Sequence, residues 1–118
     1  MAYKRGRWSL EKLLKGDVVV IPFPFSDLSS TKKRPALIVA VLDGDDIILC
    51  QITSSRIDKY SIKIENKDFK EGSLNVESNI RPNRLFTADK SLVVYKISKL
   101  KENKIQEVIK KIEQILRE

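Results

Sequence analysis

A short acidic turn between two apolar runs is the feature that most constrains the fold of this chain. Residues 43–46 read Asp-Gly-Asp-Asp, and they separate the run PALIVAVL at 35–42 from the run IILCQIT at 47–53. Asp-Gly between two such runs is a strong signal for a tight β-hairpin turn. The sequence therefore predicts two antiparallel strands paired about this turn, and the first is apolar enough to lie in the core.

Further short runs separated by turn residues predict more strands. Residues 18–23 are β-branched and apolar, and Pro22 cannot donate to a strand ladder, so this strand is expected to end there or to run along an edge. Shorter strands are expected at 61–65, 74–76, 80–87 and 93–97, with loop at 67–72. From residue 101 to residue 116 the apolar residues recur at helical spacing with charges between them, which predicts one amphipathic helix.

Together these elements predict the fold class. The 118 residues fit a single domain, 1–118, that is long enough to bury a core without disulfides or metals. Many short strands with hairpin turns and one closing helix favour an α+β domain that is mainly β, built as a small, strongly curved β-barrel with a C-terminal amphipathic helix.

The charge of the chain points to an anionic partner. There are 23 basic and 16 acidic residues, a net charge of +7. The cations gather in three places: residues 1–15, which form a basic N-terminal extension with a short helix expected at 9–14, the run Lys32-Lys33-Arg34, and the pair Arg81 and Arg84. Nucleic acid is the first candidate partner, although solubility alone is an alternative reason for a basic balance of this size.

The residues that the chain lacks also limit its chemistry. There is no histidine, the usual acid–base residue near neutral pH, and there is no convincing set of metal ligands, so we expect neither a metal nor a cofactor. Catalysis would have to use arginines, hydroxyls, carboxylates or backbone groups. Cys50 lies in an apolar run and is expected to be a buried structural thiol. No apolar run approaches the ~18 residues of a membrane span, so a cytoplasmic protein without a membrane partner is expected.

Hairpin geometry brings two polar residues together. Arg34 directly precedes the first hairpin strand and Thr53 ends the second, so counting outward from the turn places the guanidinium beside the hydroxyl. A planar fork of donors suits a phosphate, and Ser54 and Ser55 add further donors. For each residue taken alone, a solvated loop charge or an ordinary strand end is the simpler interpretation.

Two other segments carry candidate nucleic-acid contacts. In IRPNRLFT, strand alternation puts Arg81, Asn83 and Thr87 on one face and Arg84 on the other, unless Pro82 introduces a bulge. Phe25, among the prolines of IPFPF, is the best candidate for stacking on a base.

These motifs in this order resemble the PemK/MazF-like toxins of prokaryotic toxin–antitoxin systems. The resemblance is carried by GDVVVIPFPFSDLSSTKKRPALIV, then CQITSS after the hairpin, then IRPNRLFTADKSLV and the closing helix, and it covers residues 15–116. It implies an SH3-like barrel that acts as a homodimer. It also implies an endoribonuclease that cuts single-stranded RNA at short sequences, and a cognate antitoxin that blocks the RNA groove.

The resemblance also implies roles for individual residues. The arginine of the RP motif and the hydroxyl of the ITS motif, here Arg34 and Thr53, correspond to the catalytic pair, and Ser54 to a phosphate contact. Lys32 and Lys33 are expected to steer the flanking RNA backbone. Some members of the family carry a carboxylate where this chain has Asn83, and because an amide cannot act as a base, the expectation for Arg81 and Asn83 is RNA contact only.

A site without histidine or metal suits RNA cleavage by the substrate's own 2′-hydroxyl, which would leave a 2′,3′-cyclic phosphate and a 5′-hydroxyl. Arg34 and Thr53 would align the reacting groups and stabilise the charge of the transition state. Two alternatives stay open at the level of sequence: a non-catalytic module that binds nucleic acid or a peptide, and a regulator that binds DNA together with its antitoxin.

Overall fold

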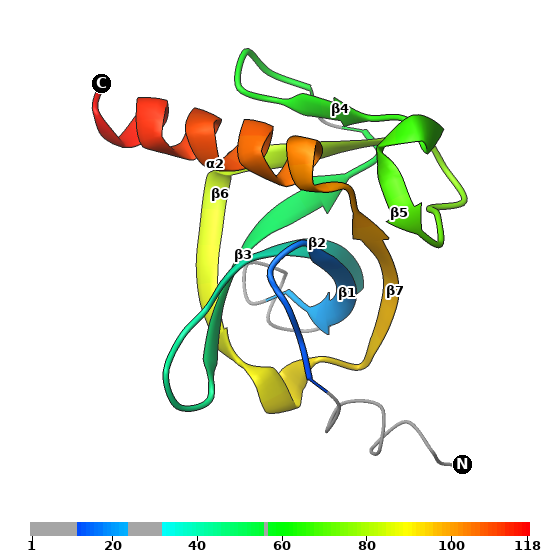
Figure 1. Cartoon of the computed structure of the whole chain (residues 1–118), viewed down its shortest axis with the longest axis vertical. Coiled ribbons are helices and arrows are strands. Elements are labelled where there is room, and N and C mark those ends of the chain that lie inside the picture. The colour runs from blue at the N-terminus through cyan, green and yellow to red at the C-terminus, as the bar shows by residue number, and fades with distance from the viewer. Residues whose placement is uncertain (1–11, 24–31, 56) are drawn as a thin grey trace.

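The computed structural model describes residues 12–23, 32–55 and 57–118, and these form one antiparallel sheet and one long helix (Figure 1). The sheet has the strand order β4-β6-β3-β2-β1-β7-β5 and curls strongly. Its strands are β1 (Asp17–Pro22), β2 (Lys33–Val41), β3 (Asp46–Thr53), β4 (Ile62–Ile64), β5 (Phe69–Glu71), β6 (Ser78–Asp89) and β7 (Tyr95–Leu100). Helix α2 (Glu102–Leu116) closes the chain, and two 3-10 turns, η1 (Asn66–Asp68) and η2 (Lys90–Leu92), lie between strands. The predicted α+β, mainly β fold is confirmed.

The hairpin predicted from the acidic turn is present as β2 and β3. The register pairs Ile38 with Leu49 and Ala36 with Gln51. The backbone N–H of Leu42 donates to the carbonyl of Asp46 at 3.0 Å, and Gly44 takes a φ of 84°, a left-handed conformation in which glycine has no steric cost. The acidic turn therefore sets the register of the residues next to it, and a bulge at Val39 shifts the register by one residue farther along β2.

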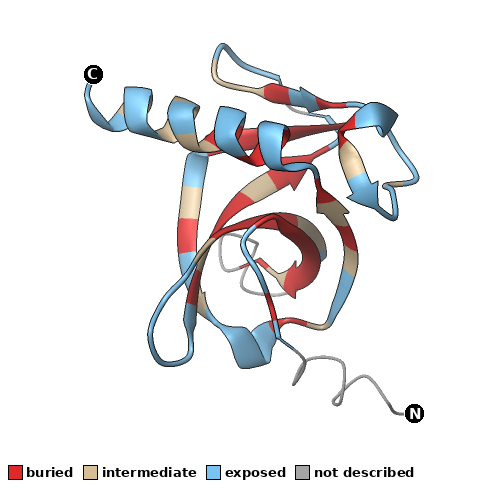
Figure 2. Ribbon diagram, in the orientation of Figure 1, coloured by how far each residue is buried: buried red, intermediate tan, exposed pale blue. Residues whose placement is uncertain are grey.

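Alternate residues of the strands pack into two separate cores, because the side chains of a strand point to opposite faces in turn. Figure 2 shows long buried stretches in the central strands. The helix-side core includes Leu37, Cys50 and Ile80 together with Ile105 and Val108 of α2. The opposite core, on the other face of the strands, consists of Leu13, Val19, Ile21, Phe23, Ala36, Ile38, Ile47, Leu49, Phe86 and Val93. The central strands are thus covered on both faces, which explains why their sequences are continuously apolar.

The helix predicted at the C-terminal end is confirmed as α2. It places Ile105 and Val108 on the sheet, and Lys104 beside them is also buried, with its Nζ 3.4 Å from Oδ2 of Asp68. Within the described residues, no helix is long and apolar enough to cross a membrane.

A buried carboxylate fixes the start of β1. Asp17 is fully buried, and its Oδ1 lies 3.3 Å from Nζ of Lys96 and 3.2 Å from Nζ of Lys99, both on β7. Its Oδ2 accepts a hydrogen bond from the backbone N–H of Leu14 at 2.8 Å. Asp17 therefore ties together the entry to the sheet, β1 and β7.

Several sequence predictions were wrong in detail. Residues 74–76 are not a strand, and β5 lies within the segment predicted as a loop. The three residues of β5 pair only with the distant strand β7, so no local pattern marks them. The strand predicted at 80–87 runs from Ser78 to Asp89. Most of the helix predicted at 9–14 lies outside the described residues, and residues 12–14 are not helical.

Cys50 is buried in the helix-side core, as predicted. Burial away from water raises the pKa of its thiol to about 12, so the thiol stays protonated near neutral pH.

Candidate functional site

The register of the sheet brings Arg34 and Thr53 together on neighbouring strands. Arg34 of β2 pairs with Ile21 of β1, and on the other side of β2, Ala36 pairs with Gln51 of β3. Continuing that register by two residues, beyond the last pair of the ladder, sets Arg34 beside Thr53. Residues opposite one another share a face of the sheet, so both side chains lie on the face of the opposite core. This agrees with the adjacency predicted from the hairpin.

The two residues have different surroundings. Arg34 is half-buried, and no hydrogen bond or ion pair engages its guanidinium among the described residues. Thr53 is only 8% exposed, and its Oγ1 accepts a hydrogen bond from the backbone N–H of Ser55 at 3.2 Å. Oγ1 also lies 3.5 Å from the hydroxyl of Ser55. The Thr53 side chain is thus anchored to Ser55, while the guanidinium of Arg34 makes no such bond to another described residue.

Strands β6 and β4 extend this polar face. Asn79 lies opposite Thr53, and Lys63 of β4 lies opposite Asn79. Together with Arg34 these residues make a row of polar side chains across four neighbouring strands, β2, β3, β6 and β4. A second row begins with Arg81, which lies opposite Gln51.

Gln51 and Asn79 were not among the residues predicted from the sequence. The pairing of β3 with β6 joins segments far apart in the chain. No turn between them signals the register, so local patterns could not place Asn79 beside Thr53.

A bulge in β6 decides where the IRPNRLFT side chains point. The register with β3 jumps from Gln51–Arg81 to Cys50–Leu85, so residues 82–84 are extra in β6. Pro82 lies within this bulge, as the sequence suggested. Because of it, Thr87 pairs with Ile48, which packs on the helix-side core. The structure therefore does not bring Thr87 to the face that carries Arg81, Thr53 and Arg34.

Arg81 is anchored by an acidic residue that the sequence analysis missed. Its side chain is 9% exposed, and Nη2 lies 3.2 Å from Oδ2 of Asp58. The amide of Asn83, in the bulge, reaches the same oxygen at 3.4 Å. Arg81 and Asn83, both predicted as RNA contacts, thus converge on one carboxylate in the loop after β3. Asp58 carries no motif, and only the path of the loop brings it to β6.

Asp58 also organises its own loop. Its Oδ1 accepts a hydrogen bond from the backbone N–H of Tyr60 at 2.9 Å, and its own N–H donates to the hydroxyl of Ser61 at 2.9 Å. The bond from Tyr60 is the main reason that the pKa of Asp58 lies below its ordinary value, and hydrogen bonds from Arg81, Ser61 and Asn83 lower it further. Because its pKa is lowered, the carboxylate of Asp58 is ionised at neutral pH but is a weak base, so it is a poor candidate for a general base.

The remaining predicted residues lie around this face. Lys32 and Lys33 are exposed at the start of β2, next to Arg34, and Ser54 is exposed directly after Thr53. Arg84 is exposed in the bulge. Phe25 lies outside the described residues.

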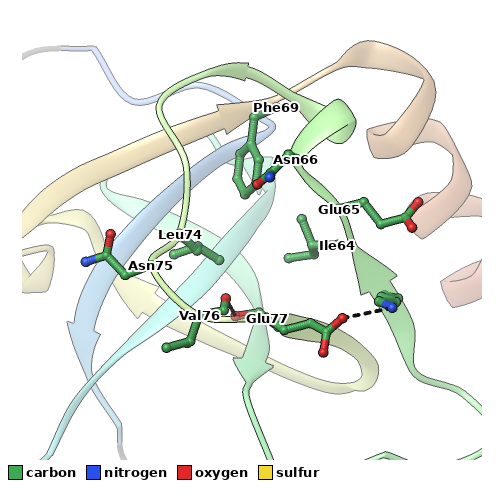
Figure 3. A pocket seen from close by; sticks show the side chains of 10 residues that line it. Ile64, Glu65, Asn66, Phe69, Leu74, Asn75, Val76 and Glu77 are labelled. Carbon is green, nitrogen blue, oxygen red and sulfur yellow. Dashed lines mark hydrogen bonds and ion pairs between the residues drawn. The ribbon is translucent and has the colours of Figure 1, made fainter.

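A separate pocket of about 390 Å³ lies beside β4, η1 and β5 (Figure 3). Three apolar side chains face one another across the pocket: Ile64, Phe69 and Leu74. At its rim, Nζ of Lys63 forms an ion pair with Oε2 of Glu77 at 2.9 Å. The three apolar residues pack against the helix-side core, away from the face of Arg34 and Thr53. None of the predicted site residues lines this pocket.

Among the described residues, the candidate site offers no cluster of metal ligands. Over the part of the chain that the structure describes, no group of three or more histidine, cysteine, aspartate or glutamate side chains is arranged to hold a metal ion.

Comparison with known proteins identifies the family. The family model described as the PemK-like, MazF-like toxin of type II toxin–antitoxin systems matches residues 14–116. The chain belongs to this family. The match covers β1 through the end of α2, and so includes every predicted site residue.

Solved structures share the fold at low sequence identity. An endoribonuclease from a mycobacterial species, solved in complex with its cognate antitoxin, is 13% identical with a TM-score of 0.70, covering 89% of this chain and 95% of that one. The Mycobacterium tuberculosis toxin MazF-mt6 is 14% identical with a TM-score of 0.67, covering 86% and 96%. MazF from Deinococcus radiodurans is 16% identical with a TM-score of 0.63, covering 87% and 94%. No curated protein sequence matches the chain significantly.

Proposed function

We propose that this PemK/MazF-like toxin is a metal-independent endoribonuclease that cuts single-stranded RNA, with mRNA as its target in the cytoplasm. The observation that carries the proposal is the placement of Arg34 and Thr53 on one face of adjacent strands, in a chain that has no histidine. The motifs that carry these residues fall within the family match, and solved proteins of the same fold are described as endoribonucleases.

The proposed reaction needs little from the protein beyond alignment and charge. The 2′-oxygen of the RNA attacks the neighbouring phosphorus, a bond forms between O2′ and phosphorus, and the bond from phosphorus to O5′ breaks. The 2′-hydroxyl gives its proton to water and the leaving O5′ takes one up, so the products are a 2′,3′-cyclic phosphate and a 5′-hydroxyl. The Arg34 guanidinium stabilises the added negative charge on the phosphate oxygens, and the Thr53 hydroxyl orients one of them.

Arginine suits this electrostatic role better than that of a proton donor. Its free pKa exceeds ~12, so it keeps its charge throughout the reaction. The backbone of Arg34 is held by β2, a strand that is paired on both sides, so the arginine extends from a rigid element. A cation carried on a rigid element needs less reorganisation to stabilise the charge of a transition state.

The nature of the product ends tests this chemistry. RNA fragments made by the protein should accept a 5′-phosphate from a polynucleotide kinase without prior dephosphorylation. Methylation of the 2′-hydroxyl at the nucleotide before the cut should abolish cleavage there and leave other cuts intact. A 5′-phosphate on the product, or cleavage that survives 2′-methylation, would show that another reaction takes place.

The proposal extends to two protein partners. A homodimer and a cognate antitoxin that covers the RNA-binding face are proposed on the family match, and the mycobacterial relative of similar fold was solved with its antitoxin. Sedimentation equilibrium of the purified chain tests the first partner: a mass of twice 13.6 kDa is expected, and a monomer at micromolar concentration would contradict it. The antitoxin is expected to compete with single-stranded RNA for binding to the chain.

A further inference from the structure

The ion pair between Arg81 and Asp58 leaves a buried donor without a partner. The Arg81 side chain is 9% exposed, and Asp58 takes up only Nη2. Nε of Arg81 is buried and has no hydrogen-bond partner in the described structure. A buried arginine N–H without an acceptor is costly, and it is the kind of group that a ligand satisfies.

The contact that covers this donor is itself weak. Oδ2 of Asp58 lies 3.2 Å from Nη2 of Arg81 and 3.4 Å from Nδ2 of Asn83, whereas strong charge-assisted bonds from nitrogen to oxygen measure about 2.7–2.9 Å. The pair meets end-on through one nitrogen, although a guanidinium can present Nε and Nη2 together to two oxygens of one anion.

The turn that carries Asp58 does not depend on Arg81. Oδ1 of Asp58 is bonded to Tyr60, and the Asp58 N–H is bonded to Ser61. The carboxylate keeps 35% of its side chain exposed, so an approaching anion reaches it before it reaches Arg81. Oδ2 can therefore leave Arg81 while the turn stays closed.

We propose that Arg81, together with Asn83, is a second phosphate site for RNA, and that Asp58 occupies it in the free protein as a displaceable internal anion. A backbone phosphate of bound RNA takes the place of Oδ2 and bonds both Nη2 and the unpartnered Nε. The inference rests on the proposed function, since it assigns the occupant of the same RNA-binding face. Arg81 lies opposite Gln51, two residues or about 7 Å along β3 from Thr53, so the second phosphate neighbours the one held by Arg34.

The carboxylate of Asp58 then opposes RNA binding, and removing its charge should make the protein bind RNA more tightly. The test uses a mixed-sequence 2′-O-methyl RNA 20-mer, which has no 2′-hydroxyl and cannot be cut by the proposed reaction. Its binding to wild type and Asp58→Asn is measured by fluorescence polarisation at several salt concentrations. Asp58→Asn is expected to bind about two- to fivefold more tightly, the strength of one exposed ion pair. The dependence of log K on log salt should stay nearly the same, because both proteins make the same number of phosphate contacts once RNA is bound.

A matched control separates this effect from a change in net charge. Asp45 lies in the β2–β3 turn, at the far end of β3 from Thr53, and its carboxylate is exposed 3.8 Å from Lys90. Asp45→Asn removes the same charge and should bind RNA as the wild type does. In an Arg81→Gln background, Asp58→Asn should tighten binding no more than Asp45→Asn does. Asp58→Asn that binds RNA no better than Asp45→Asn, or that binds more weakly than the wild type, would overturn the proposal.

A second measurement needs no variant that must fold. The Arg81 Nε–H resonance of the wild type should shift when the 2′-O-methyl RNA is added, and its exchange with water should slow. An unchanged resonance in a protein saturated with RNA would refute the inference. Cleavage of unmodified RNA is assayed in parallel: tight binding by Asp58→Asn without any cleavage by wild type would overturn the nuclease proposal and leave this one standing.

Discussion

Removal of the buried carboxylate of Asp17 is expected to destabilise the whole sheet. Asp17 is fully buried, and it accepts one backbone hydrogen bond and contacts two lysines of β7. Asp17→Ala leaves the N–H of Leu14 without its acceptor, which costs about 1–3 kcal/mol. It also leaves two lysines without their counter-ion, and a fully buried broken pair costs about 3–5 kcal/mol.

The exposure of the lysines reduces the second cost. Their side chains keep 33% (Lys96) and 16% (Lys99) of their surface in water, so the broken pair costs less than a fully buried one, about 2 kcal/mol, and the lost hydrogen bond adds about 1 kcal/mol, for a total of about 3 kcal/mol. Asp17→Asn keeps an acceptor for Leu14 and loses only the charge, so about two thirds of that loss is expected. In a domain of this size about 3 kcal/mol lowers Tm by roughly 10 °C.

Urea unfolding followed by circular dichroism, at one fixed chain concentration, measures these differences. The midpoint should fall in the order wild type, Asp17→Asn, Asp17→Ala, with an unchanged slope. Asp45→Ala, which removes an exposed carboxylate from the β2–β3 turn, should unfold like the wild type. Equal stability of Asp17→Ala and wild type would refute the reasoning, and equal loss in the two Asp17 variants would show that the charge, not the hydrogen bond, carries the whole effect.

Three further predictions concern single residues. Cys50, with its pKa raised to about 12, should not react with Ellman's reagent at pH 8 until the protein is unfolded in urea; rapid reaction of the native protein would contradict its burial. Gly72→Ala should destabilise the fold by about 2 kcal/mol, because φ is 70° and a Cβ would lie 2.7 Å from the carbonyl oxygen of Ile97. Gly44→Ala, with a φ of 84° and open space around the residue, should destabilise the fold less. The reverse order of the two variants in urea unfolding would be inconsistent with this packing. The carboxyl of Asp58 should titrate below 3.8 in a carbon-13 NMR experiment, so its contribution to stability is present above pH 3.8 and is lost as the pH falls through the lower folded pKa. Arg81→Gln should raise the pKa of Asp58 only in part, because the hydrogen bond from Tyr60 remains. A full return of the pKa to 3.8 in this variant would mean that Arg81 alone sets it.

The elements that could be predicted from the sequence are those whose partners are close in the chain. The hairpin of β2 and β3 is set by its own turn, so counting residues outward from Gly44 places Thr53 at Pro35, next to Arg34, and a bulge at Val39 that the sequence did not signal shifts the register by one residue toward Arg34. The helix α2 was visible from the spacing of its apolar residues, because one face of it packs on a sheet.

The features that the sequence did not reveal depend on contacts between distant segments. The register of β6 against β3 changes at a bulge of three residues, and Pro82 signalled a bulge without fixing its length or its effect on Thr87. Asp58 reaches Arg81 only because the loop after β3 folds back over β6, a contact 23 residues apart in the chain. The placement of Arg34 and Thr53 on neighbouring strands was therefore predictable, while the partners of Arg81 were not.

The most direct test of the proposed function is cleavage of a long single-stranded RNA in excess EDTA by wild type, Arg34→Ala and Thr53→Ala, with cuts mapped by primer extension. Ser73→Ala, an exposed hydroxyl outside the candidate site, serves as the matched control. Wild type and Ser73→Ala should produce the same discrete cuts, and each of the two site variants should lose about 10²–10³-fold in rate, the usual effect of removing one group that stabilises the transition state. Equal cutting by all four proteins, or cutting that stops in EDTA, would contradict the assignment of Arg34 and Thr53 to a metal-independent active site.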